Sequence, residues 1–120
     1  MTAPNLMVIT SVVGKLTGAN LTTSLTGIIS NASNSNQLYR INSVTVTNIN
    51  GTNAADVNVS IYKNMTTDYY VASTISIPAD ATLIVATKDM NLYLEENDTL
   101  RASASLNNYL QILVSYEVVQ

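Results

Sequence analysis

The stretch LRASASLNNYLQILVSYEV, residues 100–118, decides the fold class because it contains two alternating apolar runs separated by a turn. The apolar positions of the first run are Leu100, Ala102 and Ala104. Those of the second run are Leu110, Ile112, Val114, Tyr116 and Val118. A period of two places alternate side chains on opposite faces of a strand. The stretch therefore predicts two half-buried strands joined by a turn at residues 106–108.

The same pattern extends back to residue 38 and predicts five more strands. Ile41 is out of phase with Val44 and Val46, which predicts a bulge near residues 42–43. Asn50-Gly51 then predicts a turn with positive φ. The predicted strands lie within residues 38–48, 57–62, 69–77, 83–87 and 92–94.

Two of these strands have a predicted buried face. Val57, Val59 and Ile61 share one face of the clearest half-buried strand. In the next strand the alternation places four residues on one face, namely Val71, Ser73, Ile75 and Ile77. Seven strands after residue 37, with no helical period, predict a single antiparallel β-sandwich of residues 38–120, with jelly-roll or immunoglobulin-like strand order left open.

Residues 1–37 are rich in Thr and Ser and alternate only weakly. The segments 6–13 and 21–30 could each add a strand to a sheet. Weak patterning specifies strand pairing weakly, so this region is predicted to be either an N-terminal arm or a pair of edge strands. An arm would dock on a neighbouring subunit by adding a strand to its sheet.

The chain has no Cys and no His, which excludes most enzyme designs. Without them there is no thiol nucleophile, no imidazole base, and no thiolate or histidine metal site. We therefore expect no enzyme, with no catalytic residues, no cofactor-binding residues, no metal site and no cofactor. Six Asn-x-Ser/Thr sequons match the Asn-rich composition and carry no weight without a secretion signal.

Charge is sparse: 5 Lys and Arg against 8 Asp and Glu give a net charge of −3. Without a basic cluster we expect no nucleic-acid partner. No secretion signal or 18-residue apolar run stands out, so we expect no membrane partner and a soluble protein made in the cytoplasm. Surface polarity comes from 15 Asn, 15 Thr and 12 Ser. Such a surface can be covered by a partner without burying unpaired charges.

The acidic stretch Glu95–Asp98, with Asp89 upstream, is expected to be a plain solvated turn. Its spacing fits no EF-hand, and adjacent turn carboxylates do not fix the separation that a glycosidase requires. Asp98 and Arg101 are expected to pair across this turn, with a contribution below about 1 kcal/mol.

The chain contains seven tyrosines and neither Phe nor Trp. Tyr116 shares parity with the apolar face of its strand and is expected in the core or at its edge. Tyr62 is expected on a polar face, and one of Tyr69 and Tyr70 away from the core. Exposed rings of this kind anchor interfaces or stack on sugars, although packing on a sheet face is the commoner role.

Several ordered motifs in the last two-thirds of the chain resemble small virion proteins of tailed bacteriophages, most closely those of marine and cyanobacterial phages. The motifs are a strand ending in VTN at residues 46–48, IPADATL at 77–83, YLEENDTLRASAS at 93–105, and SYE at 115–117. Asn97 stands where glycine is commoner in that pattern, and asparagine also tolerates a left-handed backbone. Each motif is structural rather than catalytic.

This resemblance implies a virion structural protein without enzymatic activity, in particular a head decoration (cement) protein. Its partners would be the major capsid protein or other virion proteins, it would form a homo-oligomer, and it would be located in the virion after assembly in the host cytoplasm. Two alternatives stay open. One is a neck, tail or fibre-associated virion protein, and the other is a carbohydrate-binding module that attaches to host glycans through exposed tyrosines.

Overall fold

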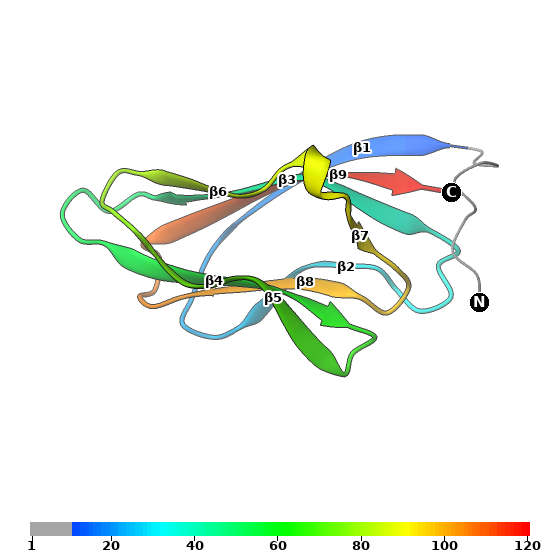
Figure 1. Cartoon of the computed structure of the whole chain (residues 1–120), viewed down its shortest axis with the longest axis horizontal. Helices are drawn as coiled ribbons and strands as arrows, with labels where there is room; N and C mark the ends of the chain where they lie inside the picture. The colour runs from blue at the N-terminus through cyan, green and yellow to red at the C-terminus, as the bar shows by residue number, and fades with distance from the viewer. Residues whose placement is uncertain (1–10) are drawn as a thin grey trace.

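The computed structural model describes residues 11–120, which form nine β-strands and one 3-10 helix (Figure 1). All seven strands predicted after residue 37 are present. The elements are β1 (Val12–Asn20), β2 (Thr26–Ser30), β3 (Leu38–Asn48), β4 (Ala55–Lys63), β5 (Thr67–Ile77), β6 (Thr82–Ala86), η1 (Lys88–Met90), β7 (Leu92–Leu94), β8 (Thr99–Ala104) and β9 (Leu110–Val119).

The strands form two antiparallel sheets packed face to face as a sandwich. Sheet I has the order β1-β9-β3-β6, with β7 also paired to β3, and sheet II has the order β2-β8-β4-β5. The pairs are nested, since β1 pairs with β9, β2 with β8, β3 with β6 and β4 with β5. A long antiparallel ribbon rolled across two sheets in this way is a jelly roll, so the strand order excludes the immunoglobulin-like alternative.

The core lies between the two sheets and contains the residues that the alternation identified. Leu100, Ala102 and Ala104 of β8 are buried, and so are Leu110, Ile112, Val114, Tyr116 and Val118 of β9. These two strands belong to opposite sheets, so the turn between them carries the chain from one layer to the other. In β4, Val57 and Val59 are buried and Ile61 packs against the core, as predicted.

The sequence predicted a bulge in β3 and a turn with positive φ after it, and only the first of these predictions is correct. The predicted bulge is confirmed by a shift in the pairing with β9 between Ile41 and Ser43. The predicted positive φ at Asn50-Gly51 is wrong, because neither residue has a left-handed backbone. The Asn50 side chain shapes this loop instead: its Oδ1 accepts hydrogen bonds from the backbone N–H groups of Thr52 and Asn53 at 2.9 and 2.8 Å.

The predicted buried face of β5 is only partly correct. Ile77 is buried as predicted, but Ile75 is exposed, and Ala72, which has the opposite parity, is buried. Two shifts in the pairing with β4 each add a residue to β5, and each extra residue reverses the parity of the side chains that follow. Thr74 lies within the irregular part with a φ of 50°, and its N–H donates to Oδ1 of Asn58 on β4 at 2.8 Å.

The described part of residues 1–37 forms edge strands of the sandwich itself. β1 is an edge of sheet I and β2 is an edge of sheet II. Most of the predicted segment 6–13 lies outside the described residues, and the strand runs from Val12 to Asn20. The segment 21–30 contains the shorter β2. Leu21 and Ile29 are buried in the same core as the later strands, so residue 37 does not separate two cores.

Asparagine supplies most of the left-handed backbone positions among residues 11–120. No glycine there has a positive φ, whereas six asparagines do, namely Asn34, Asn36, Asn64, Asn91, Asn97 and Asn108. Asparagine tolerates this region better than other residues with a Cβ, because its short amide can bond to nearby backbone. This explains how a chain with only four glycines makes its turns.

Candidate interaction surface

The outward face of sheet I carries exposed aliphatic side chains across its width. One cross-strand row runs from Ile84 on β6 through Thr45 on β3 and Leu113 on β9 to Gly18 on β1. Ile84 is 63% exposed and Leu113 is 47% exposed. Leu113 alternates with the buried residues on β9, which places its side chain on the outer surface. Leu16, in the neighbouring row, is 66% exposed.

Hydroxyl and amide groups fill the rest of this face. The hydroxyls of Thr47 and Thr82 lie 3.0 Å apart, and Nε2 of Gln111 donates to Oδ1 of Asn20 at 2.9 Å. Arg40 and Glu117 are directly opposite each other near one end of the face and form an ion pair at 2.9 Å. The face is therefore electrically neutral, and its polar groups are mainly uncharged.

A shallow hollow of about 430 Å³ opens in this face over β1, β3 and β9. Gly18 contributes to it because the glycine leaves no side chain beside Leu113. The lining residues are Gly18, Ala19, Asn20, Thr45, Thr47, Gln111, Ile112 and Leu113. None of them is titratable, so the hollow offers hydrogen bonds and apolar contact but no acid, base or charged nucleophile.

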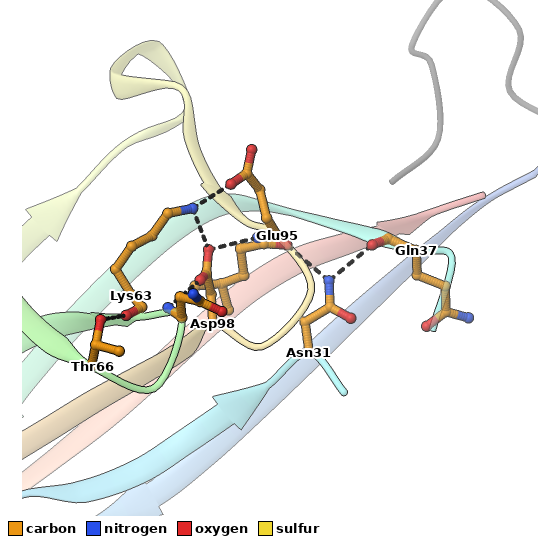
Figure 2. A network of polar contacts seen from close by, with 8 residues as sticks. Asn31, Gln37, Lys63, Thr66, Glu95 and Asp98 are labelled. Atoms are coloured by element: carbon orange, nitrogen blue, oxygen red, sulfur yellow. Dashed lines mark hydrogen bonds and ion pairs between the residues drawn. The ribbon is translucent and has the colours of Figure 1, made fainter. Parts of the chain in front are cut away.

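The acidic stretch at residues 95–98 is more than the solvated turn that was expected. Asp98 is only 1% exposed, and its carboxylate accepts hydrogen bonds from Nζ of Lys63 at 2.8 Å and from the backbone N–H groups of Asn64 and Glu95 at 2.8 and 2.9 Å (Figure 2). Lys63 also bonds to the Glu95 carboxylate. Asp98 thus joins the β4–β5 turn to the β7–β8 turn.

The electrostatics of this cluster follow from those contacts. Partial burial lowers the pKa of Lys63, but the hydrogen bonds and attraction from Asp98 and Glu95 outweigh that effect, so its pKa lies above the ordinary value of 10.5. Every oxygen of Asp98 is engaged by a donor of the chain. This arrangement stabilises the fold and leaves neither carboxylate oxygen of Asp98 free for a ligand.

Asn31 extends the cluster to the β2–β3 loop and was not singled out from the sequence. Its Nδ2 donates to the backbone carbonyls of Gln37 and Leu94, both at 2.9 Å (Figure 2). Its Oδ1 accepts from Oγ of Ser35 at 2.6 Å. Asn31 is buried, but it stands in an Asn- and Ser-rich tract, so composition alone could not distinguish it from its exposed neighbours.

The predicted pairing of Asp98 with Arg101 is wrong, because both residues have other partners. The Arg101 guanidinium lies 3.5 Å from the Asp68 carboxylate and 4.3 Å from the centre of the Tyr62 ring. These groups meet because Tyr62 is directly opposite Asp68 in the sheet pairing, and Arg101 is opposite Ser60. Asp98 lies before β8 and is turned toward Lys63 instead.

The tyrosines divide between core and surface. Tyr116 is buried, as predicted, and stacks on Tyr39 with ring centres 5.5 Å apart. Burial and the neighbouring Tyr116 raise the pKa of Tyr39. Tyr69 and Tyr70 on the edge strand β5 are 63% and 53% exposed. Both therefore point into solvent, whereas the sequence required only one of them to do so.

No protein-family profile matches the chain, and no curated protein sequence is significantly similar to it. Within residues 11–120, no three acidic side chains converge in a group that could hold a metal ion. Over the same residues, no helix has the length and apolar character needed to cross a membrane.

Proposed function

We propose that this chain is a virion structural protein of a tailed bacteriophage, and specifically a head decoration protein that binds the outer capsid shell without catalysing a reaction. The observation that carries the proposal is the neutral outer face of sheet I, where Leu16, Ile84 and Leu113 are exposed among hydroxyl and amide groups. Covering such a face removes apolar area from water and desolvates no unpaired charge.

The sequence motifs and the fold support the same proposal. The phage-like motifs at residues 77–83, 93–105 and 115–117 all fall on strands or turns of the sandwich. Jelly rolls are recurrent in viral capsid and lectin domains. A fold does not define a function by itself, so the proposal rests on the chemistry of the face.

Quantitative mass spectrometry of the purified virion tests the location. We expect a molar ratio of this chain to the major capsid protein near unity. A ratio equivalent to one small ring would assign the protein to the neck, tail or fibre and overturn the decoration proposal. Absence of the chain from virions would overturn every virion assignment.

A pair of isoleucine variants tests the face. Ile84→Asp places a charge on the outer face of sheet I, and Ile75→Asp places the same charge on exposed β5 of sheet II. In cosedimentation with heads that lack the protein, we expect Ile84→Asp to weaken binding about ten-fold or more and Ile75→Asp to bind normally. Equal binding by both variants would overturn the assigned face.

Glycan binding is the second candidate function, favoured by the exposure of Tyr69 and Tyr70. Exposed aromatic rings present flat apolar faces on which sugars stack. The paired variant Tyr69→Ala, Tyr70→Ala should abolish binding on a glycan array if this function is correct. Tyr39→Phe, a change at a stacked tyrosine away from β5, is the control. If the unmodified protein binds no glycan, or if the paired variant binds glycans as well as the unmodified protein does, this candidate is overturned.

A further inference from the structure

Strand β1 differs from the other edge strands of the sandwich. The pairing of β2 with β8 contains a shift, the pairing of β5 with β4 contains two, and β6 and β7, which within residues 11–120 both pair only with β3, have only five and three residues. Short edges and bulges prevent unwanted pairing with other chains. β1 has nine residues, most of them exposed, and its pairing with β9 is regular from Val12 to Asn20.

The hydrogen bonds to β9 determine which peptide groups of β1 point outward. Ser11 and Gln120 exchange two backbone hydrogen bonds, at 2.8 and 3.0 Å. In an antiparallel pair such residues alternate with residues whose N–H and C=O point the other way. The even-numbered residues of β1 therefore direct their peptide groups away from β9, where no strand of residues 11–120 pairs with them. They are Val12, Gly14, Leu16, Gly18 and Asn20.

We propose that β1 pairs antiparallel with β1 of a second copy of this chain, about a two-fold axis that passes beside Leu16. In this register Leu16 is opposite Leu16 of the second copy, Gly14 is opposite Gly18, and Val12 is opposite Asn20. Every outward-pointing peptide group of the strand then meets an outward-pointing group of its copy. The strand is self-complementary because Leu16 is at its centre.

Charge and side-chain size select this register over its neighbours. A shift of the axis to Lys15 would place two ammonium groups directly opposite each other, which is destabilising. With the axis at Leu16, Lys15 is opposite Thr17. Gly14 and Gly18 have no side chains and therefore leave room on either side of the axis. Even a Cβ added at Gly14 would meet no atom of its own chain within 4 Å. Leu16, which is 66% exposed in the single chain, is then covered by its copy.

This pairing joins the two copies of sheet I into one continuous sheet and sets their neutral outer faces side by side. The inference does not rest on the proposed function, because it concerns the chain alone in solution. A chain that dimerises through β1 but does not bind capsids would overturn the decoration proposal and leave the dimer proposal intact. A chain that binds capsids but stays monomeric in solution would overturn the dimer proposal and leave the decoration proposal intact.

Substitution of one glycine tests the hydrogen bonds of the edge. Gly14→Pro removes an outward N–H and leaves the bonds to β9 in place, since proline is tolerated where the N–H of an edge strand faces outward. Gly14→Ala keeps the N–H and is the matched control. By sedimentation equilibrium we expect dimers of the unmodified chain and of Gly14→Ala, and a Kd about ten-fold or more higher for Gly14→Pro. Monomers throughout, or equal Kd values, would overturn the proposal.

Single cysteines test the register and remain informative if the proline variant does not fold. The chain has no cysteine of its own, so each variant carries one thiol. Leu16→Cys places two sulfurs across the axis at a separation compatible with a disulfide, whereas Val12→Cys places them at opposite ends of the paired strands. Under mild oxidation we expect a covalent dimer from Leu16→Cys only. Equal yields from both variants, or no dimer from Leu16→Cys, would overturn the register.

Discussion

The ammonium nitrogen of Lys63, at the end of β4, lies 2.8 Å from the carboxylate of Asp98, in the turn before β8 (Figure 2). The two residues differ sharply in exposure, since the Lys63 side chain is 42% exposed and that of Asp98 only 1%. A buried carboxylate depends on all of its donors, whereas a half-exposed lysine can exchange its partner for water. The two ends of this ion pair therefore have unequal importance for stability.

Asp98→Ala should lower the free energy of unfolding by about 3 kcal/mol, because it leaves two backbone N–H groups without their acceptor and removes one of the two carboxylates that bind Lys63. Lys63→Met should cost less, about 2 kcal/mol, because the buried carboxylate loses one donor but keeps its two backbone N–H donors. Glu95→Gln, at the exposed partner of Lys63, is the control and should change stability by less than about 0.5 kcal/mol. Urea unfolding measures all three variants, and equal losses for Asp98→Ala and Glu95→Gln would contradict the assigned role of Asp98.

Stability should decline at alkaline pH through Lys63 and Tyr39. Both have a folded pKa raised above the ordinary values of 10.5 and 10.0. A group with a raised folded pKa contributes stability that is complete below its unfolded pKa and is lost as the pH rises through its folded pKa. The decline should therefore begin near pH 10. Urea unfolding at successive pH values should give a shallower decline for Lys63→Met and for Tyr39→Phe, and an unchanged slope in both would contradict the prediction.

Thr74→Gly should stabilise the protein. Thr74 has a left-handed backbone, which is unfavourable for a β-branched residue, and glycine removes that strain. After the loss of the Thr74 hydroxyl contact with Asn58, we expect a net gain of about 0.5–1 kcal/mol in the free energy of unfolding. Ser73→Gly, next to it without a positive φ, should instead destabilise the protein by about 0.5–1 kcal/mol. Thermal unfolding distinguishes the two signs.

Deletion of residues 1–37 should abolish cooperative unfolding, because β1 and β2 are strands of the two sheets and Leu21 and Ile29 belong to the core. Calorimetry of the truncated chain checks this. A milder test is Leu21→Ala, with an expected loss of about 3 kcal/mol. Leu106→Ala, at an exposed turn leucine, should stay within about 0.5 kcal/mol of the unmodified protein. A truncated chain that still unfolds cooperatively would restore the arm interpretation.

The strands with a strict period of two could be predicted from the sequence. The residues that the alternation assigned to the core in β8 and β9 are all buried, although it missed Val119, and the phase change between Ile41 and Val44 located a bulge. In β5 the same reasoning failed at Ile75, because extra residues change the parity without leaving a break in the apolar pattern. Alternation specifies a face only while the pairing stays regular.

The polar cluster was harder to predict than the strands. Asp98 was assigned to a solvated turn because its neighbours are polar, yet its burial depends on Lys63, which is 35 residues away in the sequence. Arg101 was paired with Asp98 by proximity along the chain, whereas its partner Asp68 lies across the sheet. Partners of this kind are determined by strand order. The alternation does not specify that order, because it shows which face a residue occupies but not which strand lies beside it.

The nested pairing of the strands also determines how slowly the protein acquires its structure. Among residues 11–120, the only strand that pairs with β1 is β9, at the other end of the chain, and β9 lies between β1 and β3 in sheet I. Domains dominated by such distant pairings fold in milliseconds to seconds, because loop closure must precede the contacts that offset it. During synthesis, β1 therefore leaves the ribosome with its apolar residues exposed and stays without a partner until β9 has emerged, which makes this interval the one in which a chaperone would most reduce aggregation.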